Sequence, residues 1–145
     1  MEVVKLVDAE LVLLKLQELN RYLAQLKKHQ GATASVLIDD LDKAWIIQHG
    51  LQLSIQVLLD IGNHILAAEG VAVREYADIF HELARLKILP EEYAQSIKGM
   101  AGLRNLLVHE YAGIDMDIVS DILNNRLQDF SMFASHIADY LTHNK

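Results

Sequence analysis

The sequence predicts an all-α fold, an up-and-down bundle of about five helices in a single domain that spans residues 1–145. Apolar residues recur at spacings of three and four along most of the chain, which is the period of an amphipathic helix. Strand signals are few, because β-branched runs are short and no Asn-Gly or Asp-Gly hairpin turn occurs. Proline, which interrupts helices, occurs once, at position 90.

The first helix is expected at about Asp8–His29, and Gly31 is placed to end it as a C-terminal cap. The second is expected at about Val36–Glu69. It is apolar on more than one face, which indicates packing on several sides. Gly50 and Gly62 within it permit the close approach of a neighbouring element. The first helix has one apolar stripe, which consists of Leu16, Leu19, Leu23 and Leu26.

The third helix is expected at about Arg74–Lys87, with Tyr76 on its apolar side. Pro90 and the two glutamates after it indicate the start of a fourth helix, since a helix N-terminus accepts proline and favours negative charge. This helix is expected to end at about His109–Ala112. A fifth helix is expected at about Asp115–Thr142, and its first residue is a suitable N-terminal cap.

Composition limits the classes of function. The chain contains no cysteine, so disulfides and thiolate metal sites are impossible. No apolar run approaches the roughly 18 residues of a membrane span, and no secretory signal is visible, so we expect a cytoplasmic protein without membrane association. The net charge of −7 argues against broad nucleic-acid binding, DNA included, which relies on many Lys and Arg contacts to phosphate. A local site with one or two cations remains compatible with it.

The segment at residues 104–111, which reads R-N-L-L-V-H-E-Y, carries the most suggestive chemistry. Arg104 is a permanent cation with planar donors suited to phosphate, and His109 can act as a general acid or base near neutral pH. Asn105 adds an amide and Tyr111 a phenol. An arginine, a histidine and a tyrosine together can stabilise a pentavalent phosphorane and move a proton, which is what cleavage of RNA by its own 2′-hydroxyl requires, without a metal. The alternative is that these side chains only cap the carbonyls of a helix C-terminus.

Helical geometry constrains how these side chains could meet. At 100° per residue, Tyr111 lies about 20° from Arg104, whereas His109 lies about 140° from it. Either the last helical turn before Gly113 is distorted, or the site is formed by two copies of the helix that face each other. In the second case, a dimer is part of the mechanism.

A second group of polar residues lies in the long second helix. Asp60 and His64 are four residues apart and share a face, and Asn63 lies beside them. They either line a cleft that faces the Arg104 segment or form a solvated pair, and two possible ligands alone are weak evidence for a metal. A row of glutamines on the same helix is read as an exposed polar face or as part of a dimer seam; it consists of Gln48, Gln52 and Gln56.

The R-N-L-L-V-H-E-Y segment resembles the R-x-x-x-x-H-x-Y motif of the HEPN superfamily, and specifically its HepT-like toxin group. Three further stretches resemble the same group: L-D-I-G-N-H-I-L-A within 58–67, V-R-E-Y-A-D-I-F-H-E-L-A-R-L-K-I-L-P at 73–90, and M-A-G-L-R-N-L-L-V-H-E-Y-A-G-I-D at 100–115. The resemblance covers most of the chain and is best from about residue 41 to residue 130.

This resemblance implies a homodimeric helical bundle with the two motifs in one cleft. It also implies a metal-independent endoribonuclease, without a cofactor, that acts as the toxin of a toxin–antitoxin pair. The implied partner is a minimal nucleotidyltransferase antitoxin, which neutralises the toxin by adding AMP to Tyr111. Arg104 and His109 carry over as catalytic residues. A supporting role carries over less directly to Asn105, Asp60, Asn63 and His64.

Two alternatives remain at this point. The same helices could form a non-catalytic module that binds a nucleotidyltransferase or a nucleotide, which the acidic net charge favours. They could also form a structural adaptor, in which Arg104 and His109 are capped singly and lie away from any cleft.

Overall fold

The computed structural model describes residues 7–109 and 113–143, and all regular structure in those two ranges is helical. The all-α prediction is therefore confirmed. The described residues form eight helices: α1 (Ala9–Lys27), α2 (Ala34–Asp39), α3 (Leu41–Ala68), α4 (Ala77–Arg85), α5 (Glu91–Ile97), α6 (Met100–His109), α7 (Met116–Asn125) and α8 (Leu127–His143).

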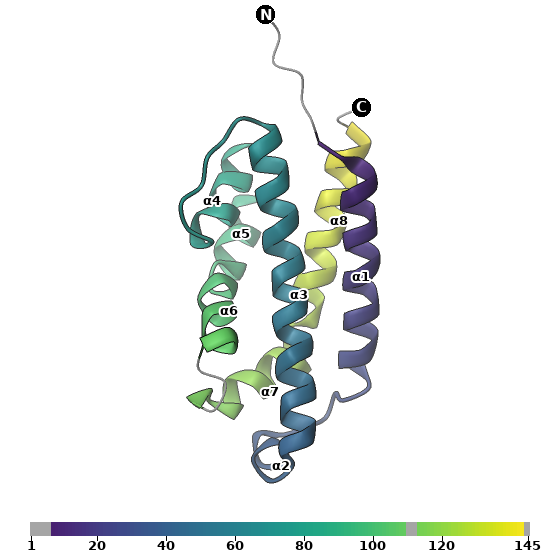
Figure 1. Cartoon of the computed structure of the whole chain (residues 1–145), viewed down its shortest axis with the longest axis vertical. Coiled ribbons are helices and arrows are strands. Elements are labelled where there is room, and N and C mark those ends of the chain that lie inside the picture. Colours follow the sequence, from purple (N-terminus) through teal and green to yellow (C-terminus); the bar gives the residue numbers. More distant parts are fainter. Residues whose placement is uncertain (1–6, 110–112, 144–145) are drawn as a thin grey trace, which may run out of the picture.

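The helices are arranged around α3. The long helices α1, α3 and α8 run side by side along the length of the molecule (Figure 1). α4, α5 and α6 lie on the other side of α3, and α2 packs with α7 at one end. By length and composition alone, α3 could cross a membrane, contrary to the expectation from apolar runs. However, 56% of its most apolar window is buried inside the bundle, as expected for a helix at the centre of the core.

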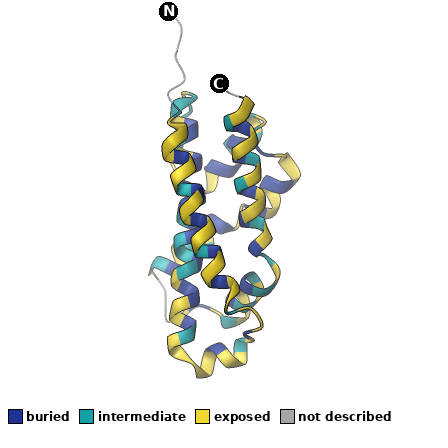
Figure 2. Cartoon of the chain, turned by 90° about the vertical axis from the view of Figure 1, so that its right-hand side faces the viewer, coloured by how far each residue is buried: buried dark blue, intermediate teal, exposed yellow. Residues whose placement is uncertain are grey.

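Each helix turns one face inward, and Figure 2 shows buried and exposed residues alternating along the helices with the helical period. The predicted stripe of α1 is buried, and it includes Val12 in addition to the four leucines. The core between α4 and α8 contains Phe80 and Phe133, whose rings meet edge to face with centroids 6.2 Å apart. This is the preferred arrangement for two aromatic rings.

Three of the five predicted helices are each divided in two. Asp40 separates α2 from α3, and its carboxylate accepts the Lys43 amide at 3.1 Å as an N-terminal cap. A two-residue break that includes Gly99, a poor helix former, separates α5 from α6. Arg126, whose backbone leaves the helical region at φ −128°, separates α7 from α8. Periodicity misses these breaks because apolar spacing continues on both sides of each one.

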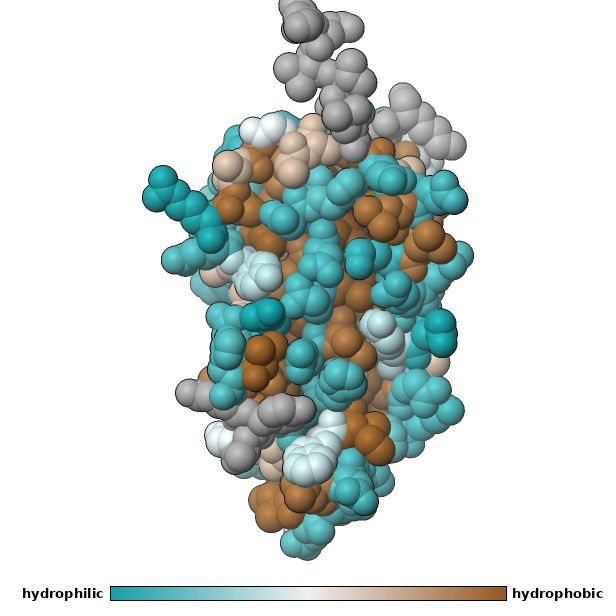
Figure 3. All heavy atoms as spheres, in the orientation of Figure 1, coloured by the Kyte–Doolittle hydropathy of each residue, from teal (hydrophilic) through white to brown (hydrophobic). Residues whose placement is uncertain are grey.

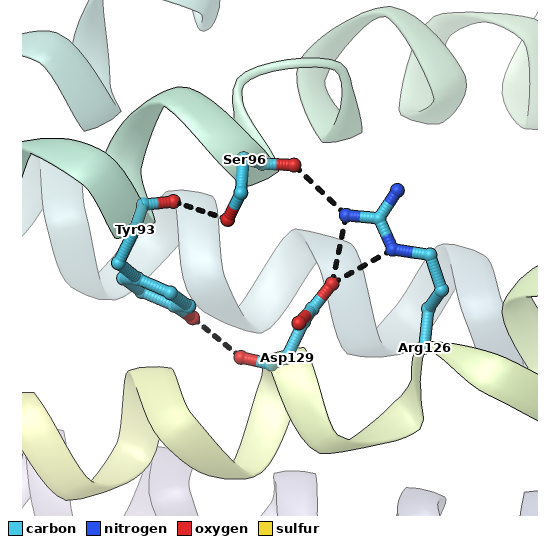
Figure 4. A network of polar contacts seen from close by, with 4 residues as sticks. All are labelled: Tyr93, Ser96, Arg126 and Asp129. Atoms are coloured by element: carbon cyan, nitrogen blue, oxygen red, sulfur yellow. Dashed lines mark hydrogen bonds and ion pairs between the residues drawn. The ribbon is translucent and has the colours of Figure 1, made fainter.

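The break between α7 and α8 is held against α5 by a polar network (Figure 4). Arg126 pairs with the Asp129 carboxylate at 2.8 Å and donates to the Ser96 carbonyl, also at 2.8 Å. The Tyr93 hydroxyl donates to the Asp129 carbonyl. Burial, and secondarily the Asp129 charge, raises the pKa of Tyr93, so its hydroxyl stays protonated and remains a donor.

The ends of two other helices differ in how well they were predicted. α1 begins one residue later than expected, because Asp8 is its N-cap and the Asp8 carboxylate accepts the Leu11 amide at 3.0 Å. Gly31 has a φ of +99° and ends the turn after α1, but the C-cap of α1 is Lys28, so the expectation that Gly31 caps this helix is wrong. The third predicted helix starts late, because α4 begins at Ala77 and Arg74 belongs to the preceding connection.

Gly62 lets α4 approach α3 closely. A Cβ atom at this position would lie 2.4 Å from Ile79 Cγ2, a contact that real side chains do not make. Ile79 is fully buried and its β-branched side chain has one strongly preferred rotamer in a helix, so it has little freedom to move away. The expectation of a close approach at Gly62 is therefore confirmed.

We expect Gly62→Ala to lower the free energy of unfolding by about 1–3 kcal/mol, the usual cost of overpacking a core. Urea denaturation measures the change. Gly102→Ala is the matched control, because a Cβ there meets no atom within 4 Å. A Gly62→Ala protein as stable as the Gly102→Ala protein would contradict the close packing of α3 and α4.

Candidate functional site

The central residues of the candidate site lie on α6. Arg104 is half-buried, whereas Asn105 and His109 are exposed, and His109 is the last residue of the helix. Tyr111, the predicted modification site, lies outside the described residues. The fourth predicted helix was expected to end at about His109–Ala112, and α6 extends to His109. It carries both proposed catalytic side chains.

The Arg104 guanidinium is held on three sides. Its Nε donates to Gln56 Oε1 of α3 at 3.0 Å, and one Nη donates to Asn105 Oδ1 at 3.2 Å. The guanidinium carbon lies 5.0 Å from the centre of the Tyr76 ring, which is a cation–π distance. Within the described ranges, the second Nη makes no hydrogen bond, so it is available to an anion such as a phosphate.

The Gln56 amide is itself oriented by a further contact. Gln56 Nε2 donates to Asp60 Oδ1 at 2.8 Å, which leaves Oε1 facing Arg104. The other oxygen of Asp60 lies 3.6 Å from the ammonium of Lys15 on α1. A chain of polar contacts therefore crosses α3 from α1 to α6. Because each member has a partner, the position of the Arg104 side chain is set by three helices.

The structure does not bring Arg104 and His109 of one chain together. α6 is α-helical through His109, so the two side chains keep the angular separation of a regular helix. The described part of the chain contains no hydrogen bond between them. A distortion before His109, which would have joined them within one chain, is absent from α6 as far as its last described residue.

The three polar residues that were predicted to support the site from the second helix have different contacts. Asp60 orients Gln56, as described above. Asn63 is exposed and shares a pocket of about 710 Å³ with Asn105 and Tyr76. His64 instead accepts a hydrogen bond from the backbone amide of Asp8, at 3.0 Å, so it ties the start of α1 to α3. Two of the three thus adjoin the Arg104 segment, and His64 has a structural contact.

Two contacts of Arg104 were not predicted. Gln56 belongs to the row of glutamines on the second predicted helix. The interpretation of this row as an exposed polar face is wrong for Gln48, which is only 3% exposed. Tyr76 was assigned to the apolar side of a helix, yet it precedes α4 and is 38% exposed. The glutamine spacing was a usable signal for Gln56. No sequence pattern connects Tyr76 to Arg104.

The family model for HepT-like ribonucleases matches residues 19–137. A tRNA nuclease HepT of Aphanizomenon flos-aquae is 33% identical over 129 residues, which cover 88% of this chain and 87% of the relative. A tri-AMPylated Shewanella oneidensis HEPN toxin, solved in complex with MNT antitoxin, aligns with a TM-score of 0.79 at 26% identity over 88% of this chain and 96% of that one. The fold is also similar to that of YutE, a cytosolic protein of unknown function from Bacillus subtilis, with a TM-score of 0.79 at 21% identity over 93% of this chain and 91% of that one.

The contact between Gln56 and Arg104 gives a direct prediction. Gln56→Leu removes the acceptor of the Arg104 Nε proton, so we expect faster hydrogen exchange at this Nε and a loss of stability of about 1 kcal/mol. NMR of the arginine Nε groups and urea denaturation measure the two effects. Gln52→Leu is the control, because it changes the neighbouring, half-exposed glutamine on the same stripe. Equal exchange at Arg104 in both variants would rule out the contact.

Proposed function

The chain belongs to the HepT-like ribonuclease family, and from this premise we propose that it is a metal-independent endoribonuclease toxin whose cleft is shared by two copies of the chain. The observation that carries the site assignment is the Arg104 guanidinium, which donates to Gln56 and Asn105 and has one Nη without a partner among the described residues. An exposed histidine follows it one and a half turns later on the same helix. RNA as the substrate places the protein in the cytoplasm.

The proposed reaction uses the 2′-hydroxyl of RNA as the nucleophile. Its oxygen forms a bond to the adjacent phosphorus, and the bond from phosphorus to the 5′-oxygen of the next nucleotide breaks. His109 accepts the proton of the 2′-hydroxyl, and a protonated His109 supplies a proton to the leaving 5′-oxygen. Arg104 donates hydrogen bonds to the non-bridging oxygens, on which negative charge grows in the transition state. The products are a 2′,3′-cyclic phosphate and a 5′-hydroxyl.

A dimer follows from the separation of Arg104 and His109 on α6. In a twofold dimer, Arg104 of one chain can meet His109 of the other, which gives two sites, and in each site one histidine can serve first as the base and then, once protonated, as the acid. Exposed apolar side chains on α2 and at the start of α3 support this arrangement. We call them the Trp45 patch, which consists of Ile38, Leu41, Trp45 and Ile46, each more than half exposed.

Trp45 and Gln56, which contacts Arg104, lie on the same side of α3. At 100° per residue, Trp45 lies within about 20° of Gln56 around the helix. Figure 3 shows apolar atoms at the end of the molecule where α2 and the start of α3 lie. A second chain that covers this patch would therefore extend along the stripe that leads to Gln56 and Arg104. Exposed apolar clusters of this kind mark protein interfaces.

The proposed partner is a minimal nucleotidyltransferase antitoxin, as in the complex of the Shewanella oneidensis toxin with MNT antitoxin. That toxin is AMPylated. Here the proposed acceptor is Tyr111, whose phenolic oxygen would form a bond to the α-phosphorus of ATP while pyrophosphate leaves. A phosphate placed two residues after His109 adds negative charge beside the proposed RNA cleft, so it would repel the substrate backbone.

The catalytic assignment predicts that His109→Ala lowers the rate of RNA cleavage by about 100-fold or more, the usual contribution of general acid–base catalysis. Cleavage of total RNA by the purified, unmodified protein measures this, as does growth of cells that lack the antitoxin. His81→Ala, which removes another exposed histidine on α4, away from the proposed interface, is the control and should retain activity. If His109→Ala is as active as the wild type, His109 is not catalytic. If the wild type itself cleaves no RNA, the non-catalytic binding module is the better description.

The dimer assignment predicts that Trp45→Glu raises the dimer dissociation constant by about 30-fold or more and abolishes cleavage, since a central aromatic residue contributes about 2 kcal/mol or more to an interface. Light scattering after size exclusion measures the oligomeric state. Met132→Glu on α8 is the control, because it adds the same charge at another exposed apolar side chain. A Trp45→Glu protein that stays dimeric would place the interface elsewhere.

The same prediction has a readout in mixed dimers. Arg104→Ala and His109→Ala proteins are each expected to be inactive. After they are unfolded together and refolded, half of the dimers carry one intact Arg104–His109 pair across the interface, so roughly a quarter of the wild-type activity should return for a twofold dimer. No recovery would mean that each site lies within one chain.

A further inference from the structure

The pocket beside Arg104 contains features of a nucleotide-binding site that cleavage of the scissile bond alone does not use. It lies between the first turns of α6, Asn63 of α3 and the connection that runs from α3 to the start of α4 (Figure 1). Its volume of about 710 Å³ is within the range of small-ligand pockets, which is about 300–1,000 Å³. We call it the Arg74 pocket. Two of its lining residues, Tyr76 and Asn105, also contact Arg104, so it continues directly from the proposed catalytic cation.

Arg74 supplies the pocket with a second cation. Its side chain is exposed and lines the pocket, and it has no hydrogen-bond or ion-pair partner among the described residues. Glu75, the carboxylate that also lines the pocket, is adjacent to it in sequence. An unpaired guanidinium binds phosphate in a bidentate manner. In a chain of net charge −7, Arg74 in the pocket and Arg104 next to it form a local site for a backbone with more than one phosphate.

Tyr76 and two amides supply the contacts that a nucleobase requires. The Tyr76 ring is 38% exposed and is in contact with the Arg104 guanidinium, so it is oriented before any ligand binds. Unpaired bases stack on such aromatic rings irrespective of sequence. Asn63 and Asn105 each carry a donor and an acceptor that can meet the edge of a base. A base within a duplex presents neither its face nor its Watson–Crick edge, so these contacts favour a single strand.

We propose that the Arg74 pocket binds the nucleotide next to the scissile phosphate, with its base on Tyr76 and its own phosphate on Arg74. This inference rests on the proposed ribonuclease function, and it assigns the substrate class as single-stranded RNA that extends at least one nucleotide beyond the cleaved bond. Arg74 and Tyr76 then determine affinity for the flanking nucleotide, whereas Arg104 and His109 act on the reacting phosphate.

The test is binding of a fluorescent single-stranded oligoribonucleotide to the His109→Ala dimer, measured by anisotropy. Adding Arg74→Gln should weaken binding by at least 10-fold and reduce the slope of log K against log salt by about 0.7, the value for one phosphate contact on a single strand. Adding Arg21→Gln is the control, because it removes the same charge from an exposed position of α1, and it should change neither. A duplex of the same sequence should bind more weakly than the single strand.

A second measurement isolates the stacking contact. An oligonucleotide with 2-aminopurine at the flanking position should lose fluorescence when it binds, because stacking quenches this base. The quenching should persist in Tyr76→Phe, which keeps the ring, and disappear in Tyr76→Ala. Absence of binding, or Arg74→Gln binding as well as Arg21→Gln, would overturn the pocket assignment. Binding with the expected pattern, combined with no cleavage by the wild type, would overturn the ribonuclease proposal and leave the pocket as a binding site.

Discussion

The central helix α3 has apolar residues around most of its circumference, and burying them requires neighbours on several sides. It packs against helices from both halves of the chain, namely α1, α2, α4, α6, α7 and α8. Only a narrow stripe of α3 stays open, and this stripe carries Gln56 and Asn63. The same packing that buries the apolar residues therefore places α6 beside α3 and the Arg104 guanidinium within reach of the Gln56 amide.

The position of one guanidinium connects the fold to the chemistry. An arginine side chain has many rotamers, and restricting it to one of them costs conformational entropy. If the side chain loses this entropy only when the substrate binds, the affinity for the substrate is lower. Gln56, Asn105 and the Tyr76 ring already restrict Arg104 in the free protein. Asp60 in turn restricts Gln56. This pre-arranged cation explains how an acidic protein can act on RNA, since it needs a few well-placed charges rather than a broad basic face.

The sequence predicted the class of fold and the close approach at Gly62, because the first depends on local periodicity and the second on one backbone position. It did not predict the breaks at Asp40 and Arg126, where apolar spacing continues through a change of helix direction. The interruption at Asp40 depends on its carboxylate capping Lys43, and Arg126 is held by Ser96, which is 30 residues away. The three polar residues Asp60, Asn63 and His64 have different contacts: Asp60 accepts from Gln56, Asn63 lines the pocket beside Arg104, and His64 accepts from the start of α1.

For Arg104 and its neighbours, the sequence by itself determined what can be read along one helix. It gives the side chains of the motif, and the helical period separates Arg104 from His109 around the axis. Only the tertiary structure decided what surrounds Arg104. Gln56 precedes it by 48 residues, and Tyr76 lies in a connection rather than in the predicted helix, so no local pattern relates them. They meet because α3 must be covered on several sides, and the packing that covers it brings these distant residues together.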